Sequence, residues 1–314
     1  MDLPYQQDKK LGRLRFWRRF REQGALQVMA GLGMLWLLIF AYLPMPGLYI
    51  AISEYNVAKP IFSSPFVGLK YINEFFRDEN VLDAIVNTLG IGGLNITIGF
   101  VIPIMFALLL NELAGLKFKK IVQTVSYLPH FISWVILGGF LISWTSEAGL
   151  FNELMLKFGL IKEPIYLLAE PEYFWGTAVV SGIWKEMGWS AIIYIAAIAG
   201  VNPELYESAT VDGARRMQRI WFVTLPSIQG TIAILFTMHI AYILSSNFDQ
   251  IFVLKNNLNA SRSTVLDIYT YRVGIQQGRF SYSAAVGLIK SVFSLALLLL
   301  SNKVSDKLTG TSLL

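Results

Sequence analysis

Long apolar runs separated by polar segments dominate this sequence, and the runs are long enough to span a membrane. A helix needs about 20 mostly apolar residues to cross the hydrocarbon core. Six runs meet that length, at about residues 26–52, 84–110, 121–145, 174–201, 228–248 and 282–300. The first is too long for a signal-peptide core and lacks a small-residue cleavage site, so we expect it to be retained. The pattern predicts an all-α integral membrane protein with six transmembrane helices.

Basic residues gather on one side of these predicted helices. Six spans place both termini on the same side, which receives 15 Lys or Arg residues against 9 on the other. Because loops rich in Lys and Arg stay in the cytoplasm, we expect both termini to be cytoplasmic. The basic stretch RLRFWRRFR at 13–21 is interpreted as a topology determinant, with an amphipathic arm on anionic lipid as the alternative.

The same pattern divides the chain into three parts. We expect a cytoplasmic basic segment at 1–26, a transmembrane domain at 27–305 and a cytoplasmic tail at 306–314. A long, amphipathic inner loop at 202–227 interrupts the domain. The outer loops are each about 30 residues, which is long for connections within a compact domain and leaves room to meet a partner outside.

Composition supports a membrane protein and excludes several kinds of chemistry. Hydrophobic residues make up 54% of the chain and charged residues 15%, with a mean hydropathy of +0.52. Soluble domains carry about 25% charged residues. The absence of cysteine from the sequence excludes disulfides, thiolate metal sites and Cys nucleophiles. Two histidines are too few for a His-rich metal site, and we attribute the net charge of +5 to membrane topology rather than to nucleic acid.

The inner loop at 201–228, VNPELYESATVDGARRMQRIWFVTLPSI, is the most distinctive segment. Asn202 can cap the N-terminus of a short helix, and Gly213 then breaks or bends the chain. The apolar spacing from Met217 to Trp221 predicts a second short helix, and Pro226 marks re-entry into the membrane. A bent pair of helices that exposes apolar and charged groups together is suited to docking into another protein.

This segment resembles the EAA loop of ABC importer permeases. In that pattern Glu-Ala-Ala is followed by three residues, Gly, nine residues and Ile-x-Leu-Pro. Glu207-Ser208-Ala209, Gly213 and Val223-Thr224-Leu225-Pro226 match it, with Ser and Val at two positions where the pattern has Ala and Ile. The resemblance implies a type I ABC importer permease fold in which this loop is a coupling helix on a separate ATPase. The residues that it assigns to coupling are Tyr206, Glu207, Ala209, Asp212, Gly213, Ala214, Leu225 and Pro226.

Other stretches resemble the branch of this superfamily that carries oligosaccharides and polysaccharides. They are NFDQIF at 247–252, residues 268–272 and 282–287, LPHFISWV around Pro129, and WKE-x-G at 184–188. The resemblance implies a bacterial inner-membrane location and a saccharide substrate. It also implies three kinds of partner: a second permease in a heterodimer, two ATP-binding subunits, and an extracytoplasmic solute-binding protein. Because the sequence lacks a Walker motif, ATP and magnesium belong to the ATPase, and this chain should bind no cofactor and perform no catalysis.

Polar side chains at membrane depth are the candidates for a saccharide path, because they are costly in lipid unless they face a partner or a wet cavity. The candidates are Lys185, Glu186, His239, Asn247 and Asp249. Since adjacent helical residues point about 100° apart, we expect one of Lys185 and Glu186 to face the cavity and the other a neighbouring helix. The structural alternatives are an interhelix ion pair for these two, helix packing for His239, and a capped turn for Asn247 and Asp249.

Charge in the last outer loop bears on the substrate. Lys255, Arg262, Arg272 and Arg279 outnumber the two aspartates of this loop. Together with Lys185 and His239 they favour an anionic saccharide such as a uronate oligomer, and contact with a binding protein is the alternative reading of the same charges.

Two other classes of function fit less well. An ion-coupled secondary transporter would need intramembrane acids and inverted repeats, whereas Glu186 is the only clear intramembrane acid in the sequence and no repeat is found. A membrane-embedded enzyme would need a feature such as HExxH or a pair of carboxylates at membrane depth, and the sequence has neither.

Overall fold

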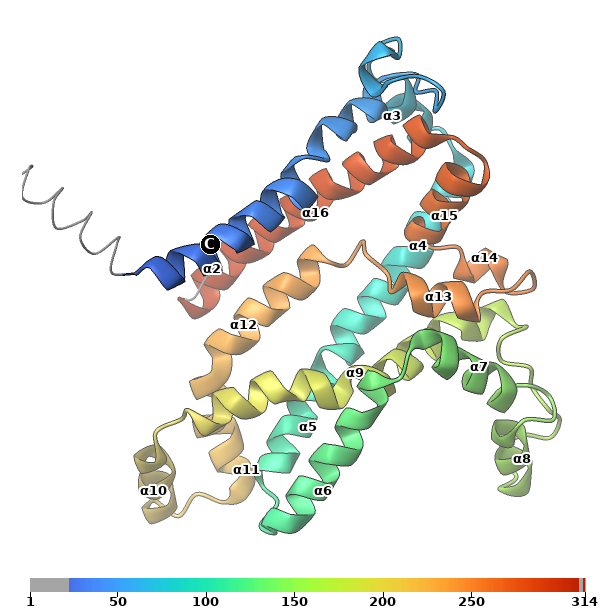
Figure 1. Cartoon of the computed structure of the whole chain (residues 1–314). Coiled ribbons are helices and arrows are strands. Elements are labelled where there is room, and N and C mark those ends of the chain that lie inside the picture. Colours follow the sequence, from blue (N-terminus) through green and yellow to red (C-terminus); the bar gives the residue numbers. More distant parts are fainter. Residues whose placement is uncertain (1–22, 311–312, 314) are drawn as a thin grey trace, which may run out of the picture. The chain divides into compact units, whose positions relative to one another are not determined.

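The computed structural model describes residues 23–310 and 313, so the basic stretch at 13–21 lies outside the described residues. Within them the chain is helical, and β pairing is confined to an isolated bridge between Ser53 and Phe66. The chain divides into two units, residues 1–68 and 69–314 (Figure 1). The all-α fold class is confirmed.

The first unit contains the first predicted span. It runs through α2 (Gly24–Leu37), the π turn η1 (Leu38–Tyr42) and the 3-10 helix η2 (Met45–Ile52). Together they form a helix of 29 residues that is long and apolar enough to cross a membrane. The bridge and the short helix η3 (Ile61–Ser63) follow in the loop behind it.

Three more predicted spans in the second unit are long apolar helices. The first combines α4 (Glu79–Leu94), η4 (Asn95–Gly99) and α5 (Val101–Asn111); the second combines α11 (Arg216–Arg219), η6 (Ile220–Thr224) and α12 (Leu225–Ala241); the third is α16 (Phe280–Thr309). They count 33, 26 and 30 residues. The last continues past the boundary expected at residue 305.

The third predicted span is broken near Pro129. Helix α6 (Leu116–Tyr127) leads into the 3-10 turn η5 (Leu128–Phe131), and α7 (Trp134–Trp144) leaves it at 99°. Proline has no backbone N–H and clashes with the preceding turn, which ends α6. Ser133 then caps α7 with its hydroxyl oxygen. The sequence indicated a proline kink, but this bend is sharper than a kink.

The fourth predicted span is α9 (Pro171–Ala199), a helix of 29 residues that packs against α5, α6 and α12. Its middle carries Lys185 and Glu186, which lower its hydropathy. Among the described residues, four helices are long and apolar enough to cross a membrane, or five if the bent pair is one span. The count of six spans therefore stays a prediction.

Small residues allow close helix contacts around α9. A Cβ atom added at Gly188 would lie 2.1 Å from the Ser126 carbonyl oxygen of α6. One added at Gly138 of α7 would lie 2.3 Å from Val253 of α13 (Phe248–Leu254). These contacts hold α6, α7 and α13 at fixed positions around the centre of the unit.

At the end of the unit opposite the inner loop, Asp78 joins three helices. It caps α4 and accepts hydrogen bonds from the hydroxyl groups of Tyr269 in α15 (Leu266–Tyr271) and Tyr282 in α16. Burial alone would raise the pKa of Asp78, but the hydrogen bonds from Tyr269, Asn80 and Tyr282 outweigh it and leave the pKa below its usual value. The beginning of α16 is thereby fixed to α4.

Candidate translocation cavity and coupling loop

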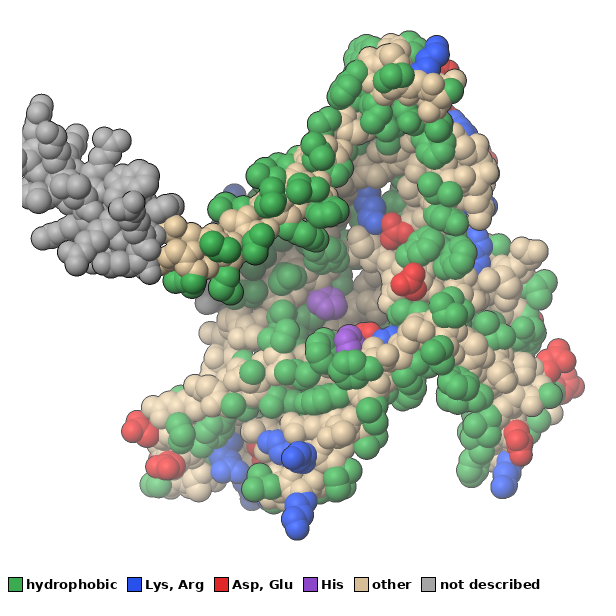
Figure 2. Space-filling view, in the orientation of Figure 1, with side chains coloured by type: hydrophobic (Ala, Val, Ile, Leu, Met, Phe, Trp, Pro, Cys, Tyr) green, Lys and Arg blue, Asp and Glu red, His purple; other side chains and the backbone are tan. Residues whose placement is uncertain are grey.

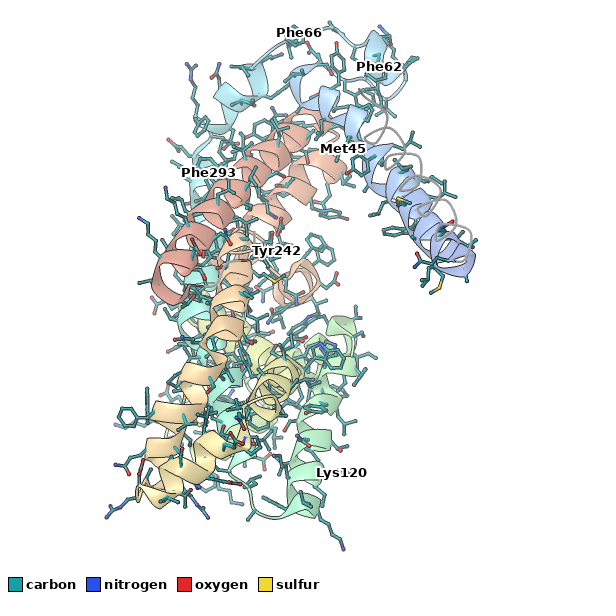
Figure 3. The ribbon with its side chains drawn as sticks, turned by 90° about the vertical axis from the view of Figure 1, so that its left-hand side faces the viewer. Met45, Phe62, Phe66, Lys120, Tyr242 and Phe293 are labelled. Atoms are coloured by element: carbon teal, nitrogen blue, oxygen red, sulfur yellow. The ribbon has the colours of Figure 1, made fainter. Side chains whose placement is uncertain are left out.

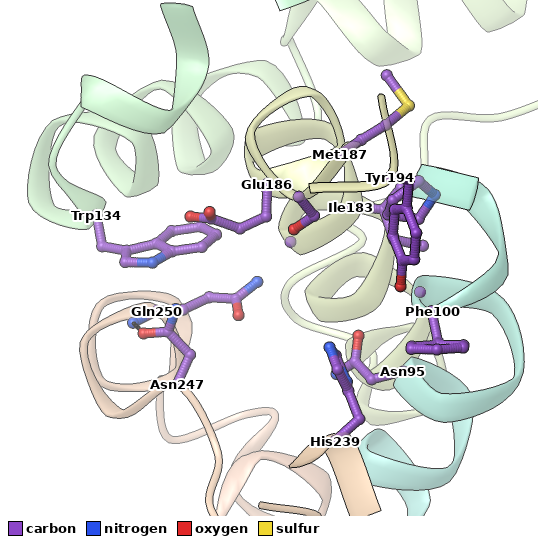
Figure 4. Close-up of a pocket in the computed structure, with 14 residues that line it drawn as sticks. Asn95, Phe100, Trp134, Ile183, Glu186, Met187, Tyr194, His239, Asn247 and Gln250 are labelled. Carbon is purple, nitrogen blue, oxygen red and sulfur yellow. Dashed lines mark hydrogen bonds between the residues drawn. The ribbon is translucent and has the colours of Figure 1, made fainter. Parts of the chain in front are cut away.

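A cavity of about 190 Å³ lies beside the middle of α9, where α7, α12, α13 and the helix of α4 and α5 meet (Figure 4). Its wall mixes polar side chains with aromatic rings. The polar ones are Asn95, Glu186, Ser190, His239, Asn247 and Gln250, and the rings are those of Phe100, Trp134 and Tyr194. Figure 2 shows both histidines of the chain, in purple, in the hollow of this face. A wall of this kind can bind a ligand that offers both hydroxyl groups and apolar ring faces.

Glu186 is held in the cavity wall by two neighbours. One carboxylate oxygen lies 2.7 Å from His130 Nδ1, and the other lies 3.2 Å from Lys185 Nζ. The Lys185 side chain is 6% exposed and the Glu186 side chain 38% exposed. Glu186 thus lines the cavity, while Lys185 lies behind it.

The helix break at Pro129 provides the rest of this arrangement. Lys185 Nζ donates to the His130 carbonyl oxygen at 2.6 Å, next to the point where α6 ends. The His130 ring stacks on Trp189, with ring centroids 4.3 Å apart and planes within 1° of parallel. The buried ammonium group therefore has two acceptors, which offsets part of the cost of taking it out of water.

On the opposite wall, α13 begins at the cavity. Asn247 caps this helix by accepting from the Gln250 backbone N–H at 3.3 Å, so its side chain lies at a helix N-terminus rather than at the end of the fifth span. Gln250 is buried and donates through Nε2 to Ala178 O at 2.6 Å and Ser181 Oγ at 3.0 Å of α9. The cap and the amide together fix α13 against α9.

Three of the five predicted substrate-path residues, Glu186, His239 and Asn247, line this cavity. Lys185 lies behind Glu186, and Asp249 is exposed on α13 without lining the cavity. The His239 ring lies 5.3 Å from the Phe100 ring. Sequence reasoning did not select the lining residues Trp134, Tyr194 and Gln250, or the supporting residue His130. Gln250 follows the helix cap Asn247 by three residues, and this spacing could have indicated Gln250 from the sequence.

The inner loop carries the helix that the sequence predicted. Helix α10 (Pro203–Val211) is capped by Asn202, whose side chain accepts from Glu204 N at 3.1 Å. It ends in a Schellman motif, in which Ala214 N donates to Ala209 O at 2.9 Å and Gly213 N donates to Thr210 O at 3.0 Å. Gly213 has a φ of +78°, which strains any residue with a Cβ atom.

The second half of the loop differs from the prediction. The predicted helical stretch around Met217 to Trp221 is present, but it continues through Pro226, because Arg216 to Ala241 form one continuous helix. Because proline lacks an N–H, the ladder must change at Pro226, and the π turn Ile220–Thr224 just before it takes up that change. Tyr206 connects α10 to this turn through its hydroxyl, 3.1 Å from Thr224 Oγ1.

The residues predicted to serve coupling fall into two groups. Tyr206 points back to the protein through its bond to Thr224, whereas Glu207 is exposed. A groove of about 370 Å³ between α10 and the start of α12 is lined in part by Ala209, Asp212 and Pro226. Lys120 of α6 lies toward the same end of the second unit, with Tyr242 farther along it (Figure 3). This end exposes basic and apolar side chains together.

The family of this chain follows from a match to a known protein family. Residues 99–309 match the family described as "Binding-protein-dependent transport system inner membrane component". The chain belongs to this family. The predicted ABC permease with the type I fold, in a multi-pass inner-membrane location, is confirmed. ATP hydrolysis in such systems occurs on a separate ATPase subunit, and the alternative of an ion-coupled transporter is set aside.

The permease is similar to its relatives along most of their length. It is 40% identical over 300 residues to the polygalacturonan/rhamnogalacturonan transport system permease protein YteP of Bacillus subtilis (strain 168), covering 95% of this chain and 93% of the relative. It is 39% identical over 276 residues to protein LplB of the same organism, covering 88% and 86%.

A solved structure gives the same result. The permease resembles a chain in the crystal structure of a bacterial ABC transporter involved in the import of the acidic polysaccharide alginate, with a TM-score of 0.85 and 37% identity. The match covers 94% of this chain and 99% of that one. A chain of a bacterial alginate ABC transporter, solved in complex with an alginate pentasaccharide-bound periplasmic protein, is also similar, with a TM-score of 0.85 and 37% identity.

Proposed function

We propose that this permease imports an acidic oligosaccharide as one half of a heterodimer driven by two ATPase subunits, with both termini in the cytoplasm. The observation that carries the proposal is the cavity beside α9, which combines aromatic rings with hydroxyl-binding side chains. The relatives named for polygalacturonan and alginate support an acidic substrate. The basic residues of the inner loops support the orientation.

The charges at the cavity are compatible with an anionic substrate. Glu186 would repel a uronate if it stood alone, but Lys185 lies 3.2 Å from it and His130 lies 2.7 Å from it. The pair of Lys185 and Glu186 carries no net charge, so its carboxylate can accept hydrogen bonds from sugar hydroxyl groups without a strong field against the anion. His239 and Asn247 add further polar contacts on the facing wall.

The proposed coupling follows the contacts of α10. We assign Glu207 and the exposed side of α10 to the ATPase surface, and Tyr206, Ala209, Asp212, Gly213, Ala214, Leu225 and Pro226 to the support of that contact. Arg219 donates to Thr210 at 3.3 Å, and Tyr206 meets Thr224 at 3.1 Å, so a pull on α10 is transmitted to the first turns of the helix from Arg216 to Ala241. His239 lies 15 residues beyond Thr224, about 22 Å along that helix. A displacement of α10 would therefore reach the cavity wall through one rigid element.

The test is uptake into proteoliposomes that contain this permease with its partner permease, ATPase subunits and solute-binding protein. We expect ATP to drive uptake of a galacturonate trisaccharide, with inhibition by vanadate and little uptake of the neutral galactose trisaccharide. The matched comparison replaces ATP by a proton gradient. Uptake with the gradient and without ATP would contradict the ATPase coupling, and preference for the neutral trisaccharide would contradict the proposed substrate.

A further inference from the structure

Three aromatic rings form a cluster outside the cavity, on the far side of α13. Phe248 and Phe252 of α13 stack with centroids 5.3 Å apart. Tyr271, at the end of α15, meets them edge-on at 5.3 and 5.7 Å. Figure 1 shows α13 and α15 in the segment that connects α12 to α16, away from α10. Phe252 is 48% exposed, so the cluster is open on one side.

Two cations follow these rings closely in the sequence. Lys255 follows Phe252 by three residues and ends α13, while Arg272 follows Tyr271 directly. Phe248, Phe252 and Lys255 are spaced by four and three residues, which places them on one side of α13. The Arg272 guanidinium also lies 5.7 Å from the centre of the Tyr269 ring. The five side chains thus combine flat apolar surfaces with two positive charges.

Among the described residues, neither cation has a carboxylate partner or an acceptor for its side-chain N–H groups. The Nε atom of Arg272 is buried and makes no hydrogen bond. Burial, and after it the neighbouring charge of Arg272, lowers the pKa of Lys255 below its usual value. A buried guanidinium donor without an acceptor is costly, which indicates that an acceptor from outside the chain completes this site.

Two neighbouring cations of the same region have carboxylate partners. Arg279 pairs with Glu74, and Lys290 pairs with Asp267. Arg262 lies 5.0 Å from the centre of the Trp175 ring, at the other end of the loop. Asp249 is six residues before Lys255, about 9 Å along the helix, and is therefore not its partner. Lys255 and Arg272 thus differ from Arg279 and Lys290 in having no carboxylate partner among the described residues, and Arg262 likewise has only a ring beside it.

We propose that Lys255 and Arg272 bind one carboxylate of the acidic saccharide, while Phe252 and its neighbouring rings pack against a sugar ring. The inference rests on the proposed function and adds a second contact site, outside the cavity, that selects for acidic sugars. Arginine and lysine supply the donors that a carboxylate needs, and charge-assisted hydrogen bonds are the stronger ones. Asn247 of the cavity wall and Lys255 are eight residues apart, about 12 Å along α13, so several linked sugar units can contact both.

The rings favour a saccharide over an acidic protein surface as the occupant. The exposed ring of Phe252 can pack against a sugar ring, whereas a carboxylate side chain of a binding protein would leave this apolar face without a contact. Lys255 and the other N–H groups of Arg272, at the start of η7 (Arg272–Gln276), are the donors that a sugar carboxylate can use. Docking of the binding protein is therefore the alternative that the experiment must separate.

The experiment uses the complete reconstituted transporter and compares a galacturonate trisaccharide with its methyl ester, which keeps the rings and removes the charges. In Lys255→Gln and Arg272→Gln we expect the KM for the acid to rise about tenfold, the scale of a lost charge-assisted hydrogen bond, with kcat unchanged. The KM for the ester should not change. Arg262→Gln, which removes a cation from the same loop, is the matched control and should behave as wild type with both sugars.

Charge-conserving variants and a binding measurement complete the design. Lys255→Arg and Arg272→Lys should restore most of the acid affinity, which a merely structural role would not produce. Equal effects on acid and ester, or no effect on either, would overturn the site. Weaker binding of the unliganded solute-binding protein to the variants would assign the cations to docking and also overturn it. Failure of the wild type to import the acid would remove the proposed function as well, whereas normal uptake by the variants would remove this site alone.

Discussion

The coupling loop and the cavity lie at different levels of the same permease, and they are held by contacts of different range. The contacts that shape α10 join residues close in sequence, such as Asn202 with Glu204 and Tyr206 with Thr224, 18 positions apart. At the cavity, His130 contacts Glu186 across 56 positions, and Gln250 reaches Ala178 across 72. The difference teaches that the loop is shaped by its own sequence, whereas the cavity is assembled from segments far apart in the chain.

The largest loss of transport is expected from a substitution that removes the local geometry of the coupling loop. Gly213→Pro cannot adopt the observed φ of +78° and loses the N–H that donates to Thr210. The misplaced proline costs about 3 kcal/mol or more, so we expect ATP-driven transport to fall about a hundredfold. The protein should still insert in the membrane, which quantitative blotting of the membrane fraction checks alongside uptake.

Two alanine variants serve as milder comparisons for Gly213→Pro. Gly213→Ala keeps the backbone N–H. Its cost is that of a Cβ atom in the left-handed conformation, about 1 kcal/mol, so transport should fall by a smaller factor. Gly115 precedes α6 in the other inner loop with a φ of −87°, and an added Cβ would find its nearest neighbour at an ordinary 3.6 Å. Gly115→Ala should transport normally. Wild-type transport by Gly213→Pro would show that the shape of α10 is not needed.

A second experiment tests whether the cavity depends on close packing between distant segments. An added Cβ at Gly188 meets the Ser126 carbonyl at 2.1 Å, whereas one at Gly176 of the same helix meets nothing within 4 Å. We expect Gly188→Ala to lower the stability of the assembled permease by about 1–3 kcal/mol. Gly176→Ala should be neutral or stabilise α9 by about 0.5–1 kcal/mol. Thermal unfolding of the purified transporter measures both, and similar midpoints for the two variants would rule out a packing role for Gly188.

The coupling loop and the cavity also differ in how much of each could be predicted from the sequence. The Asn202 cap, the Gly213 bend and the membrane helices follow from local propensity and apolar runs, so they could be anticipated without any tertiary information. The continuity of the helix through Pro226 was missed, because a π turn that absorbs a proline leaves no local signature. The cavity was predicted only in part: Glu186 was selected with the adjacent Lys185 as a polar side chain at membrane depth, but its partner His130 becomes adjacent only when α6 breaks and packs on α9.

The smallest expected effect concerns the charges at the cavity and decides whether the cluster of Lys185 and Glu186 acts electrostatically or only as support. Glu186→Gln removes the negative charge beside the cavity, so the KM for an acidic trisaccharide should fall. Lys185→Met removes the compensating positive charge, so the KM should rise. Each change should be about threefold, since charge pairs at partly exposed sites contribute about 1 kcal/mol or less.

This measurement is informative because the KM is expected to fall in one variant and to rise in the other. A supporting role predicts that both variants weaken transport in the same direction, with both acidic and neutral sugars. Glu172→Gln, in the first turn of the same helix and outside the cavity, is the control and should leave both KM values unchanged. Because Lys185 also donates to the His130 carbonyl, its removal leaves that acceptor unpaired beside the helix break. The thermal midpoint of Lys185→Met therefore has to be measured with its KM, and only a shift in KM that reverses between the two variants assigns the effect to charge.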